Sequence, residues 1–313
     1  MKILGNSSLW VEKYRPQCAD DYLATPKVRK ILDEIIKTGD IPHLLLYSKS
    51  PGTGKTTFAN VVAKELECDL LYKNGSIDTS IDSIRYDVQQ FTMTSSLMGG
   101  KKLVVLDEGE RLSPNAQEAL KVLMEQCEGN ARFIICTNNM QRIVAPVISR
   151  CQVVEFDHTE ADKQALMIQY FKRVQFILGN EGVEYDKAVL AELIKKVYPD
   201  LRKTIGQLQQ FSKTHGAITD KVFGDLDDSQ TLDLVSKMKA KKFEPIRAAC
   251  STIDPSEFFV NFYREISDLL DPSCIPDIIL ILARYANMHC LTVDQEINLV
   301  AAVVEIMTVV KWK

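Results

Sequence analysis

Residues 50–57 combine two glycines, a lysine and two threonines in a spacing that can hold phosphate groups. The segment reads SPGTGKTT; an apolar run that reads as a strand, His43–Tyr47, precedes it, and a predicted helix, Thr56–Leu66, follows. Glycines let the backbone turn tightly with its N–H groups facing phosphate oxygens, and a helix N-terminus adds partial positive charge. Lys55 would reach the β- and γ-phosphates of a nucleotide, and the Thr56 hydroxyl would ligate Mg²⁺.

This loop departs from the general phosphate-loop pattern at one position. The pattern G-x-x-x-x-G-K-[ST] has glycine where this chain has Lys49. A glycine-rich turn without a ligand is the alternative, but the order strand, loop and helix favours a phosphate site. The residues predicted to bind the nucleotide here are Pro51, Gly52, Thr53, Gly54, Lys55, Thr56 and Thr57.

Two adjacent carboxylates, Asp107 and Glu108, follow the apolar run Leu103–Leu106. In a nucleotide-hydrolysing site, Asp107 would hold Mg²⁺ through water and Glu108 would polarise the attacking water. A solvated pair of charges at a strand end is the alternative. Together with the phosphate loop, the pair predicts hydrolysis of the nucleotide rather than binding alone.

Apolar runs and amphipathic stretches alternate over the first half of the chain. Ser113 and Pro114 are typical of a helix start, and that helix is expected to reach Gln126. Strands that alternate with helices predict an α/β fold, with a mostly parallel sheet covered on both faces. The further strands are predicted at Asp69–Tyr72, Leu103–Leu106, Arg132–Cys136 and Val153–Phe156.

After Phe156 the chain reads as helical, and no further strand is expected. A turn-rich stretch, residues 216–229, marks a boundary. Thr292 with Gln295 resembles a capping box that would open the last helix. Apolar periodicity predicts helices over Ala165–Leu178, Val189–Val197 and Thr204–Phe211.

Composition and charge exclude several classes of protein. The 313 residues are 46% hydrophobic and 26% charged, which excludes a wholly disordered or fibrous chain. The eight cysteines include no C-x-x-C pair, so neither a zinc site nor a disulfide framework is expected. The apolar stretch Leu299–Val310 is too short to span a bilayer, and the N-terminus has no signal-peptide pattern, so a cytoplasmic protein is predicted. The net charge of −4 disfavours a bulk coat on nucleic acid, although residues 223–313 alone carry −5.

Several segments together resemble the AAA+ clamp-loader ATPases, the family of the replication factor C small subunits and their phage counterparts. The segments that carry the resemblance are LWVEKYRP (Leu9–Pro16), SPGTGKTT, VVLDE, AQEALKVLMEQCEGNARFIICTNN (Ala116–Asn139), ISRC (Ile148–Cys151) and DLRKTIGQLQ (Asp200–Gln209). The resemblance covers the whole chain, and the short N-terminus, the S-x-S-P-G-T-G-K-T loop and the closing Lys-Trp-Lys are most similar to members from T4-like bacteriophages. It implies a P-loop AAA+ core over residues 1–157, a helical lid over 158–222 and a helical collar over 223–313.

The same resemblance implies roles for residues beyond the phosphate loop. Tyr14, Arg15 and Pro16 would fold over the adenine of ATP. Asn138, after the fourth predicted strand, would position the attacking water or the γ-phosphate; an asparagine that closes a turn is the alternative. Its amide lies beside Asp107 and Glu108 if the sheet is ordered as in AAA+ folds.

Two arginines are implied to act on the γ-phosphate. Arg150 would serve in trans on the ATP of a neighbouring subunit, since the sequence gives it no useful target in its own chain. Arg202 would touch the γ-phosphate in cis and couple the lid to the nucleotide. A surface arginine and a plain surface ion pair are the respective alternatives.

DNA and clamp contacts are expected between the second and third strands. For the basic residues, solubilising surface charge is the alternative; for the apolar ones, it is packing in an internal core. Contacts to DNA would be made with the phosphate backbone and would not read the sequence. The residues expected to contact DNA are Arg85, Lys101 and Lys102. The residues expected to contact a sliding clamp are Phe91, Leu97 and Met98.

The resemblance therefore implies an ATP- and Mg²⁺-dependent clamp loader that opens a sliding clamp and places it on primer–template DNA. Its partners would be copies of itself and a distinct subunit in a hetero-pentamer, in the host cytoplasm if the chain is phage-encoded. Two alternatives stay open: another AAA+ DNA motor of the branch-migration helicase type, and a non-hydrolysing scaffold subunit of a clamp loader.

Overall fold

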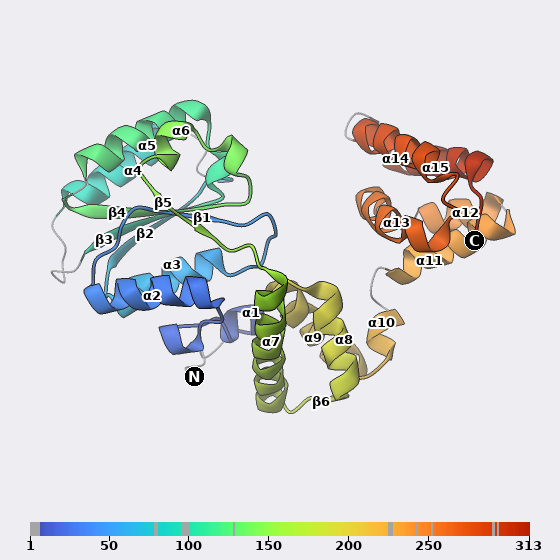
Figure 1. Cartoon of the computed structure of the whole chain (residues 1–313), viewed down its shortest axis with the longest axis horizontal. Helices are drawn as coiled ribbons and strands as arrows, with labels where there is room; N and C mark the ends of the chain where they lie inside the picture. The colour runs from blue at the N-terminus through green and yellow to red at the C-terminus, as the bar shows by residue number, and fades with distance from the viewer. Residues whose placement is uncertain are drawn as a thin grey trace. The chain divides into compact units, whose positions relative to one another are not determined.

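The computed structural model describes residues 7–77, 81–94, 101–127, 129–224, 228–241, 243–251, 253–289, 292 and 294–313. The chain divides into two compact units, Met1–Ile218 and Thr219–Lys313, and each is considered by itself. Figure 1 shows the elements of both units. No helix among these residues is long and apolar enough to cross a membrane.

The first unit is built on a five-stranded parallel sheet with the order β2-β3-β4-β1-β5. These strands are β1 (Leu44–Tyr47), β2 (Asp69–Asn74), β3 (Lys102–Asp107), β4 (Ala131–Thr137) and β5 (Gln152–Glu155). The helices of this part are α1 (Trp10–Lys13), α2 (Pro26–Thr38), α3 (Lys55–Glu65), α4 (Ile81–Met93), α5 (Pro114–Gln126) and α6 (Ala145–Ile148), with 3-10 turns η1 (Ala19–Asp21), η2 (Gly109–Arg111) and η3 (Met140–Arg142).

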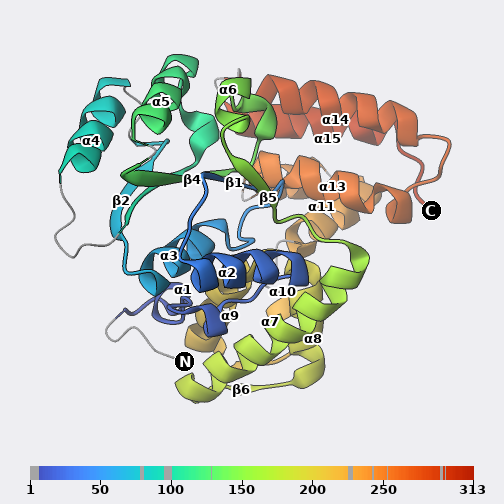
Figure 2. The same ribbon diagram turned by 60° about the vertical axis from the view of Figure 1, so that its left-hand side comes forward.

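Helices cover both faces of this sheet. Alternate strand residues such as Leu44 and Leu46 pack with α2 and α3, whereas Leu45 and Val104 pack with α4 and α5 on the opposite face (Figures 1 and 2). Because both faces are covered, the inner strands β1, β3 and β4 are mostly buried and apolar, which explains the apolar runs of the sequence, whereas the edge strands β2 and β5 carry more polar and exposed residues. The expectation of an α/β fold with a parallel sheet is confirmed.

Local sequence signals account for where several helices begin. Ser113 accepts a hydrogen bond from the Ala116 backbone N–H, and Pro114 occupies the first turn of α5. Thr159 and Asp162 form a capping box that opens α7 (Glu160–Glu181). Capping of this kind satisfies N–H groups that lack a partner within the helix.

A helical part follows the sheet within the same unit. It consists of α7, α8 (Lys187–Val197) and α9 (Leu201–His215). The prediction of no strand after Phe156 is wrong, because Glu184–Tyr185 (β6) pairs in parallel with Ala217–Ile218 (β7). Two-residue strands leave no period in the sequence, so the pairing is visible only in three dimensions.

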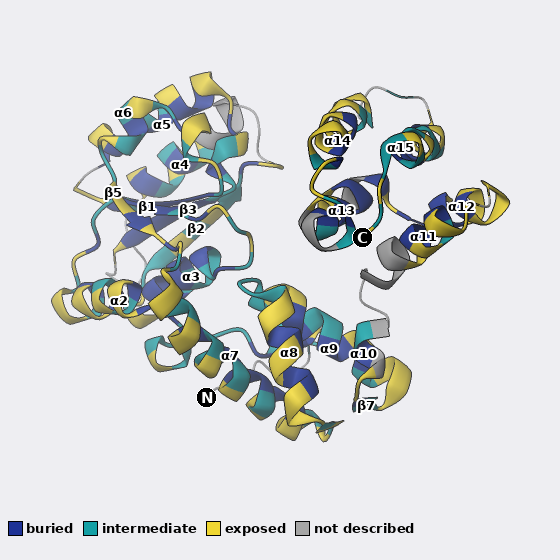
Figure 3. Cartoon of the chain, turned by 45° about the vertical axis from the view of Figure 1, so that its right-hand side comes forward, coloured by how far each residue is buried: buried dark blue, intermediate teal, exposed yellow. Residues whose placement is uncertain are grey.

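The second unit is helical and has its own core. Its helices are α10 (Lys221–Gly224), α11 (Asp228–Ala240), α12 (Phe243–Cys250), α13 (Pro255–Leu269), α14 (Ile275–His289) and α15 (Gln295–Val309). Buried residues of α11 to α15 form one cluster, seen as the dark blue inner faces in Figure 3. The predicted cap at Thr292 is wrong. Asp294 caps α15, since its side chain accepts hydrogen bonds from the backbone N–H groups of Glu296 (2.9 Å) and Ile297 (3.3 Å).

Candidate nucleotide site

The phosphate loop connects β1 to α3 at the carboxyl edge of the sheet. Gly52 and Gly54 have φ angles of +70° and +94°, in the left-handed region that favours glycine. A Cβ atom on Gly52 would lie 2.0 Å from Oδ1 of Asp200, the residue that caps α9. The loop therefore requires glycine at position 52 both for its backbone and for the close approach of Asp200.

Lys55 is 8% exposed and points along the loop toward the neighbouring strand β4. Its Nζ donates a hydrogen bond to Oδ1 of Asn138 over 2.7 Å. Burial lowers the pKa of the Lys55 ammonium, and nearby acidic groups, Asp107 among them, partly oppose this effect. The Lys55 amine thus contacts the amide oxygen of Asn138, which a bound phosphate oxygen would replace as its partner.

Thr56 and Asp107 meet at the mouth of the loop. The Thr56 hydroxyl donates to Oδ2 of Asp107 over 2.8 Å, and the Tyr72 hydroxyl donates to the same oxygen over 2.7 Å. Burial and this hydrogen bond raise the pKa of Tyr72, which keeps the phenol protonated. Hydroxyl and carboxylate oxygens are the ligands that Mg²⁺ prefers, with phosphates and waters completing its shell, so the donor set fits this ion.

Tyr72 was not identified from the sequence. It lies on β2 opposite Val105 of β3, so its position next to Asp107 follows from sheet register alone. A tyrosine on an edge strand gives no other signal of a place beside the predicted Mg²⁺ ligands.

Glu108 follows Asp107 with a left-handed backbone, φ +52°. Its carboxylate accepts a hydrogen bond from the Ser76 hydroxyl and lies 3.5 Å from Nε of Arg111. The backbone of Gly75 passes so close that a Cβ there would be 2.4 Å from the Glu108 carbonyl oxygen. The carboxylate is partly exposed and borders the same pocket as the phosphate loop.

Asn138 directly follows β4, which lies beside the strand that carries Asp107. Its backbone N–H donates to Oε1 of Glu110 over 3.2 Å, and Oε2 of Glu110 is a buried oxygen without a hydrogen-bond partner among the described residues. Glu110 was not identified as a site residue, although it stands two positions after Glu108. Its contact fixes the backbone from which the Asn138 amide projects.

One pocket brings together the phosphate loop, the N-terminal segment and the lid. Its lining includes every residue predicted to bind the nucleotide, together with Asp107, Glu108, Asn138 and Arg202. Arg202 is exposed in the first turn of α9 and reaches the pocket from the lid. The site thus unites residues separated by almost two hundred positions.

Arg173 also lines this pocket and was missed from the sequence. It is 7% exposed on α7, and its guanidinium donates to the backbone oxygen of Asp21 over 2.8 Å. Burial lowers the pKa of Arg173, and the Asp21 carboxylate opposes the shift. This contact joins the lid to the core beneath the nucleotide pocket; helical periodicity alone gives no sign of it.

Arg150 lies outside this pocket, after α6. The sequence suggested no target for it within its own chain, but its guanidinium forms an ion pair with Glu125 of α5 and donates to the Pro146 oxygen over 2.9 Å. Both side chains of the pair are partly exposed. The arginine is therefore held at the surface of the core.

The residues expected at DNA differ in their placement. Lys101 is exposed and its Nζ donates to the Gly39 oxygen over 2.6 Å. Lys102 is 4% exposed; its Nζ donates to the backbone oxygens of Phe91 and Thr94 at the end of α4. This placement disfavours a contact between Lys102 and DNA, because the amine is buried and already donates to the end of a helix. Arg85 lies on α4, and its side chain is outside the described residues.

Of the three residues expected at a clamp, Phe91 lies near the end of α4. Phe91 is half-buried against the core under α4 and α5, and the Lys102 Nζ lies 5.0 Å from its ring centroid. This placement favours the alternative of core packing for Phe91. Leu97 and Met98 lie outside the described residues.

Two family profiles match the chain. The AAA+ ATPase lid domain of the sliding-clamp-loader large subunit matches residues 162–223, and the ATPase family associated with various cellular activities matches residues 44–157. The sliding-clamp-loader large subunits of Escherichia phage RB69 and Enterobacteria phage T4 are 32% and 31% identical over 310 and 309 residues, with 96% of this chain and 96% of each relative covered. The chain belongs to the sliding-clamp-loader family of AAA+ ATPases.

Other similar proteins match a smaller share of the chain. A replication factor C small subunit from Pyrobaculum aerophilum is 38% identical over 217 residues, which are 67% of this chain and 63% of that protein. The Thermotoga maritima RuvB Holliday junction branch migration motor has a TM-score of 0.54 at 19% identity, covering 71% of this chain and 79% of that one. At that identity the likeness shows the AAA+ fold alone. The family expected from the sequence is confirmed.

Proposed function

We propose that this chain is the ATP-hydrolysing subunit of a clamp loader, which opens a sliding clamp and places it on primer–template DNA. The observation that carries the proposal is the convergence of Lys55, Thr56, Asp107, Glu108 and Asn138 on one pocket that residues of the lid also line. Membership of the clamp-loader family supports the same activity. Hydrolysis triggered by DNA would then release the clamp.

Each residue of the pocket has a role that follows from its chemistry. Lys55 neutralises the β- and γ-phosphates, and Thr56 and Asp107 would hold Mg²⁺. Bound Mg²⁺ would supply positive charge to the oxygens of the transferring phosphoryl group. Glu108 accepts a proton from the attacking water, and the Asn138 amide orients that water.

The arginines and domains act between subunits as well as within the chain. We assign residues 1–157 to the ATPase core, 158–222 to the lid and 223–313 to an oligomerisation collar. Arg202 would contact the γ-phosphate bound by its own chain and so couple the position of the lid to the nucleotide. Arg150 would leave Glu125 and stabilise charge on the ATP of a neighbour, which requires copies of this chain and a distinct subunit, together a hetero-pentamer.

DNA is proposed to be held through its phosphates, with Arg85 and Lys101 as the remaining candidates. Nucleic-acid binding of this kind is independent of sequence and falls as salt rises. Contacts spread over several subunits remove the need for a strongly basic chain, which agrees with the net charge of −4. The sliding clamp is the protein partner, and the proposed location is the cytoplasm, that of the host if a phage encodes the chain.

The test is ATP turnover by the purified chain assembled with its partner subunit. We expect clamp plus primed DNA to stimulate turnover, and the substitution Glu108→Gln to abolish it while ATP binding persists. Absence of stimulation would sink the proposal. Persistent clamp loading by the Glu108→Gln assembly at the wild-type rate would instead indicate a scaffold subunit that does not hydrolyse ATP.

The branch-migration alternative predicts strand displacement on a junction substrate. The fold likeness to a branch migration motor lies below the identity at which function transfers. The second unit, where described, is helical apart from an isolated bridge between Leu270 and Trp312. Strand displacement without clamp loading would favour this alternative.

A further inference from the structure

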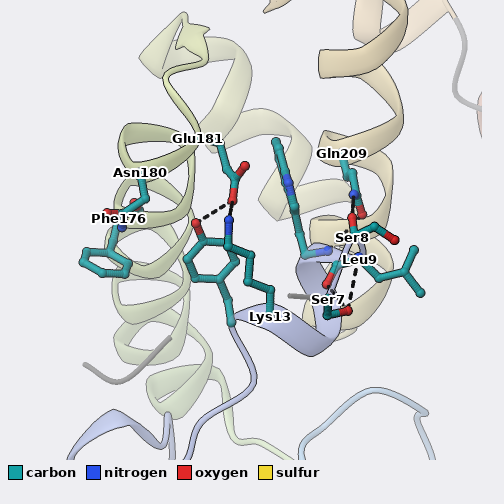
Figure 4. A network of polar contacts seen from close by, with 10 residues as sticks. Ser7, Ser8, Leu9, Lys13, Phe176, Asn180, Glu181 and Gln209 are labelled. Carbon is teal, nitrogen blue, oxygen red and sulfur yellow. Dashed lines mark hydrogen bonds and ion pairs between the residues drawn. The ribbon is translucent and has the colours of Figure 1, made fainter. Parts of the chain in front are cut away.

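Side chains of α7 and α9 attach the N-terminal segment, residues 7–16, to the lid through contacts that were not predicted from the sequence. The Trp10 backbone N–H donates to Oε1 of Gln209 over 3.0 Å, and Nε2 of Gln209 donates back to the Ser8 oxygen over 2.5 Å (Figure 4). Trp10 itself is buried. Gln209 belongs to α9, so a single amide of the lid fixes the start of α1 in two directions.

Glu181 makes the second attachment from the last turn of α7. Its Oε1 accepts hydrogen bonds from Nζ of Lys13 and from the Tyr14 hydroxyl, each over 2.6 Å (Figure 4). The Glu181 side chain is 18% exposed and Tyr14 is 3% exposed. Bonds to an ionised acceptor that is shielded from water are stronger than exposed ones.

The charge state of this attachment is well defined. Burial raises the pKa of the Glu181 carboxyl, but the hydrogen bonds from Lys13 and Tyr14 outweigh it and lower that pKa overall. Burial and the bond to Glu181 raise the pKa of Tyr14. Near neutral pH the carboxylate is therefore ionised and the phenol protonated, as the contact requires.

The segment held in this way forms a wall of the nucleotide pocket. Val11, Glu12 and Tyr14–Pro16 line the same pocket as the phosphate loop, and Ile205 of α9 joins them from the lid. Because Lys55, Thr56 and Asp107 provide the phosphate end, the base and ribose must lie toward the remaining walls. The N-terminal segment supplies much of that end.

We propose that Glu181 and Gln209 are positioning residues that carry the N-terminal wall with the lid, so that they set the affinity of the pocket for the nucleoside half of ATP. This inference rests on the proposed nucleotide site. It assigns most phosphate contacts to the core, with Arg202 as the contribution of the lid, and it assigns the nucleoside end to the N-terminal wall that the lid holds. A bound nucleotide would then contact the core through its phosphates and the N-terminal wall through its base and ribose. A movement of the lid would therefore also change the contacts to the base.

The test separates the two halves of the ligand. Binding of ATP and of inorganic tripolyphosphate is measured for the full chain and for Glu181→Ala. We expect ATP affinity to fall about tenfold, in keeping with loss of charged hydrogen bonds, while tripolyphosphate affinity stays within about twofold. An equal loss of affinity for both ligands in the folded variant would overturn the inference, and so would an unchanged ATP affinity.

Matched substitutions keep the test decisive. Glu192→Gln removes an exposed carboxylate from α8 and should leave both affinities unchanged. Tyr14→Phe removes one donor to Glu181, so the double variant with Glu181→Ala should bind ATP no more weakly than Glu181→Ala alone. If Glu181→Ala does not fold, Tyr14→Phe and Lys13→Met probe the same contact by the same two measurements.

Failure of this inference is distinguishable from failure of the proposed function. If the wild-type chain binds ATP and turns it over in the assembly while Glu181→Ala, folded, binds ATP normally, only the inference is lost. If the wild-type chain binds no ATP, the proposed nucleotide site is wrong and the inference is overturned with it.

Discussion

Lys55 and Asn138 are joined by a hydrogen bond of 2.7 Å between Nζ and Oδ1. The two residues follow neighbouring strands, because Tyr47 at the end of β1 is opposite Thr137 at the end of β4. A bound phosphate must take Lys55 away from this amide. Binding of the nucleotide would therefore free Asn138 to orient water at the γ-phosphate.

Substitution Asn138→Ala tests this exchange. We expect ATP turnover by the assembled complex to fall about 10²-fold, a size typical of the loss of one positioned hydrogen-bonding amide from an active site. ATP binding should be little changed, since Lys55 loses only a partner that ATP itself replaces. Turnover and equilibrium binding are measured separately. Asn139→Ala is the matched control: its side chain caps η3 and does not reach Lys55, and an equal loss of turnover there would contradict the role given to Asn138.

The sequence predicts the parts of this site that depend on local order. The phosphate loop is recognised from two glycines one residue apart, Lys55 and a helix start, and Asp107 is recognised from its place at the end of an apolar strand. Parallel strands bring such ends to one edge of the sheet, so the meeting of Lys55, Asp107 and Asn138 follows once the strands are recognised. The fold class is predictable for the same reason.

Contacts between distant elements leave no such pattern. Glu181 and Lys13 are 168 positions apart, and the pairs Arg173–Asp21 and Arg150–Glu125 likewise depend on how helices pack. Lys102 looks like surface charge in the sequence, but α4 ends above it and buries its amine. Local residue types therefore do not show which side chains a neighbouring element will bury.

Arg150→Ala should affect only the assembled enzyme. The ion pair with Glu125 is partly exposed, so its loss should cost less than about 1 kcal/mol of folding free energy. An arginine that stabilises charge on a neighbour's ATP is worth about 10³-fold or more in rate, so assembled turnover should collapse while ATP binding persists. Arg150→Lys should not restore it, since an ammonium lacks the planar fork. Arg142→Ala, which removes another exposed arginine of the core, is the control and should leave turnover unchanged. Normal turnover in Arg150→Ala assemblies would contradict the proposal that Arg150 acts on the ATP of a neighbouring subunit.

Lys102→Met should lower stability and leave DNA binding unchanged. The buried amine donates to backbone oxygens of Phe91 and Thr94, and leaving these unpaired should cost about 1–3 kcal/mol of the free energy of unfolding. Lys101→Met, one position away and exposed, should have a small effect on unfolding. Thermal unfolding and the salt dependence of DNA binding are measured for both variants. A DNA affinity that falls for Lys102→Met without a loss of stability would restore Lys102 as a phosphate contact.

Gly52→Ala should disable the phosphate loop. The residue has φ +70°, and a Cβ atom would lie 2.0 Å from Oδ1 of Asp200, so loop or lid must shift. We expect ATP affinity to fall at least about tenfold and folding to lose about 1–3 kcal/mol. Gly206→Ala is the control: its Cβ meets nothing within 4 Å inside α9, and alanine there should stabilise the helix by about 0.5–1 kcal/mol. Equal behaviour of the two variants would contradict the close approach of Asp200.

Protonation of His158 at acid pH should destabilise the fold. Its Nδ1 lies 2.5 Å from the Tyr198 hydroxyl; burial lowers the pKa of the imidazole, and Asp162 and Asp157 only partly oppose this. The unfolded chain therefore takes up the histidine proton at a higher pH than the folded chain. Stability from the neutral ring is complete above the ordinary pKa of about 6.5 and is lost as pH falls below it.

Thermal unfolding between pH 7.5 and 5.5, roughly the range over which histidine titrates, measures this effect. We expect the midpoint of the wild-type chain to fall with pH and the slope to flatten in His158→Gln. His215→Gln, which removes an exposed histidine from α9, should keep the wild-type slope. Because the His158 contact joins the start of the lid to the residues before α9, a slope that survives His158→Gln would show that acid acts elsewhere in the chain.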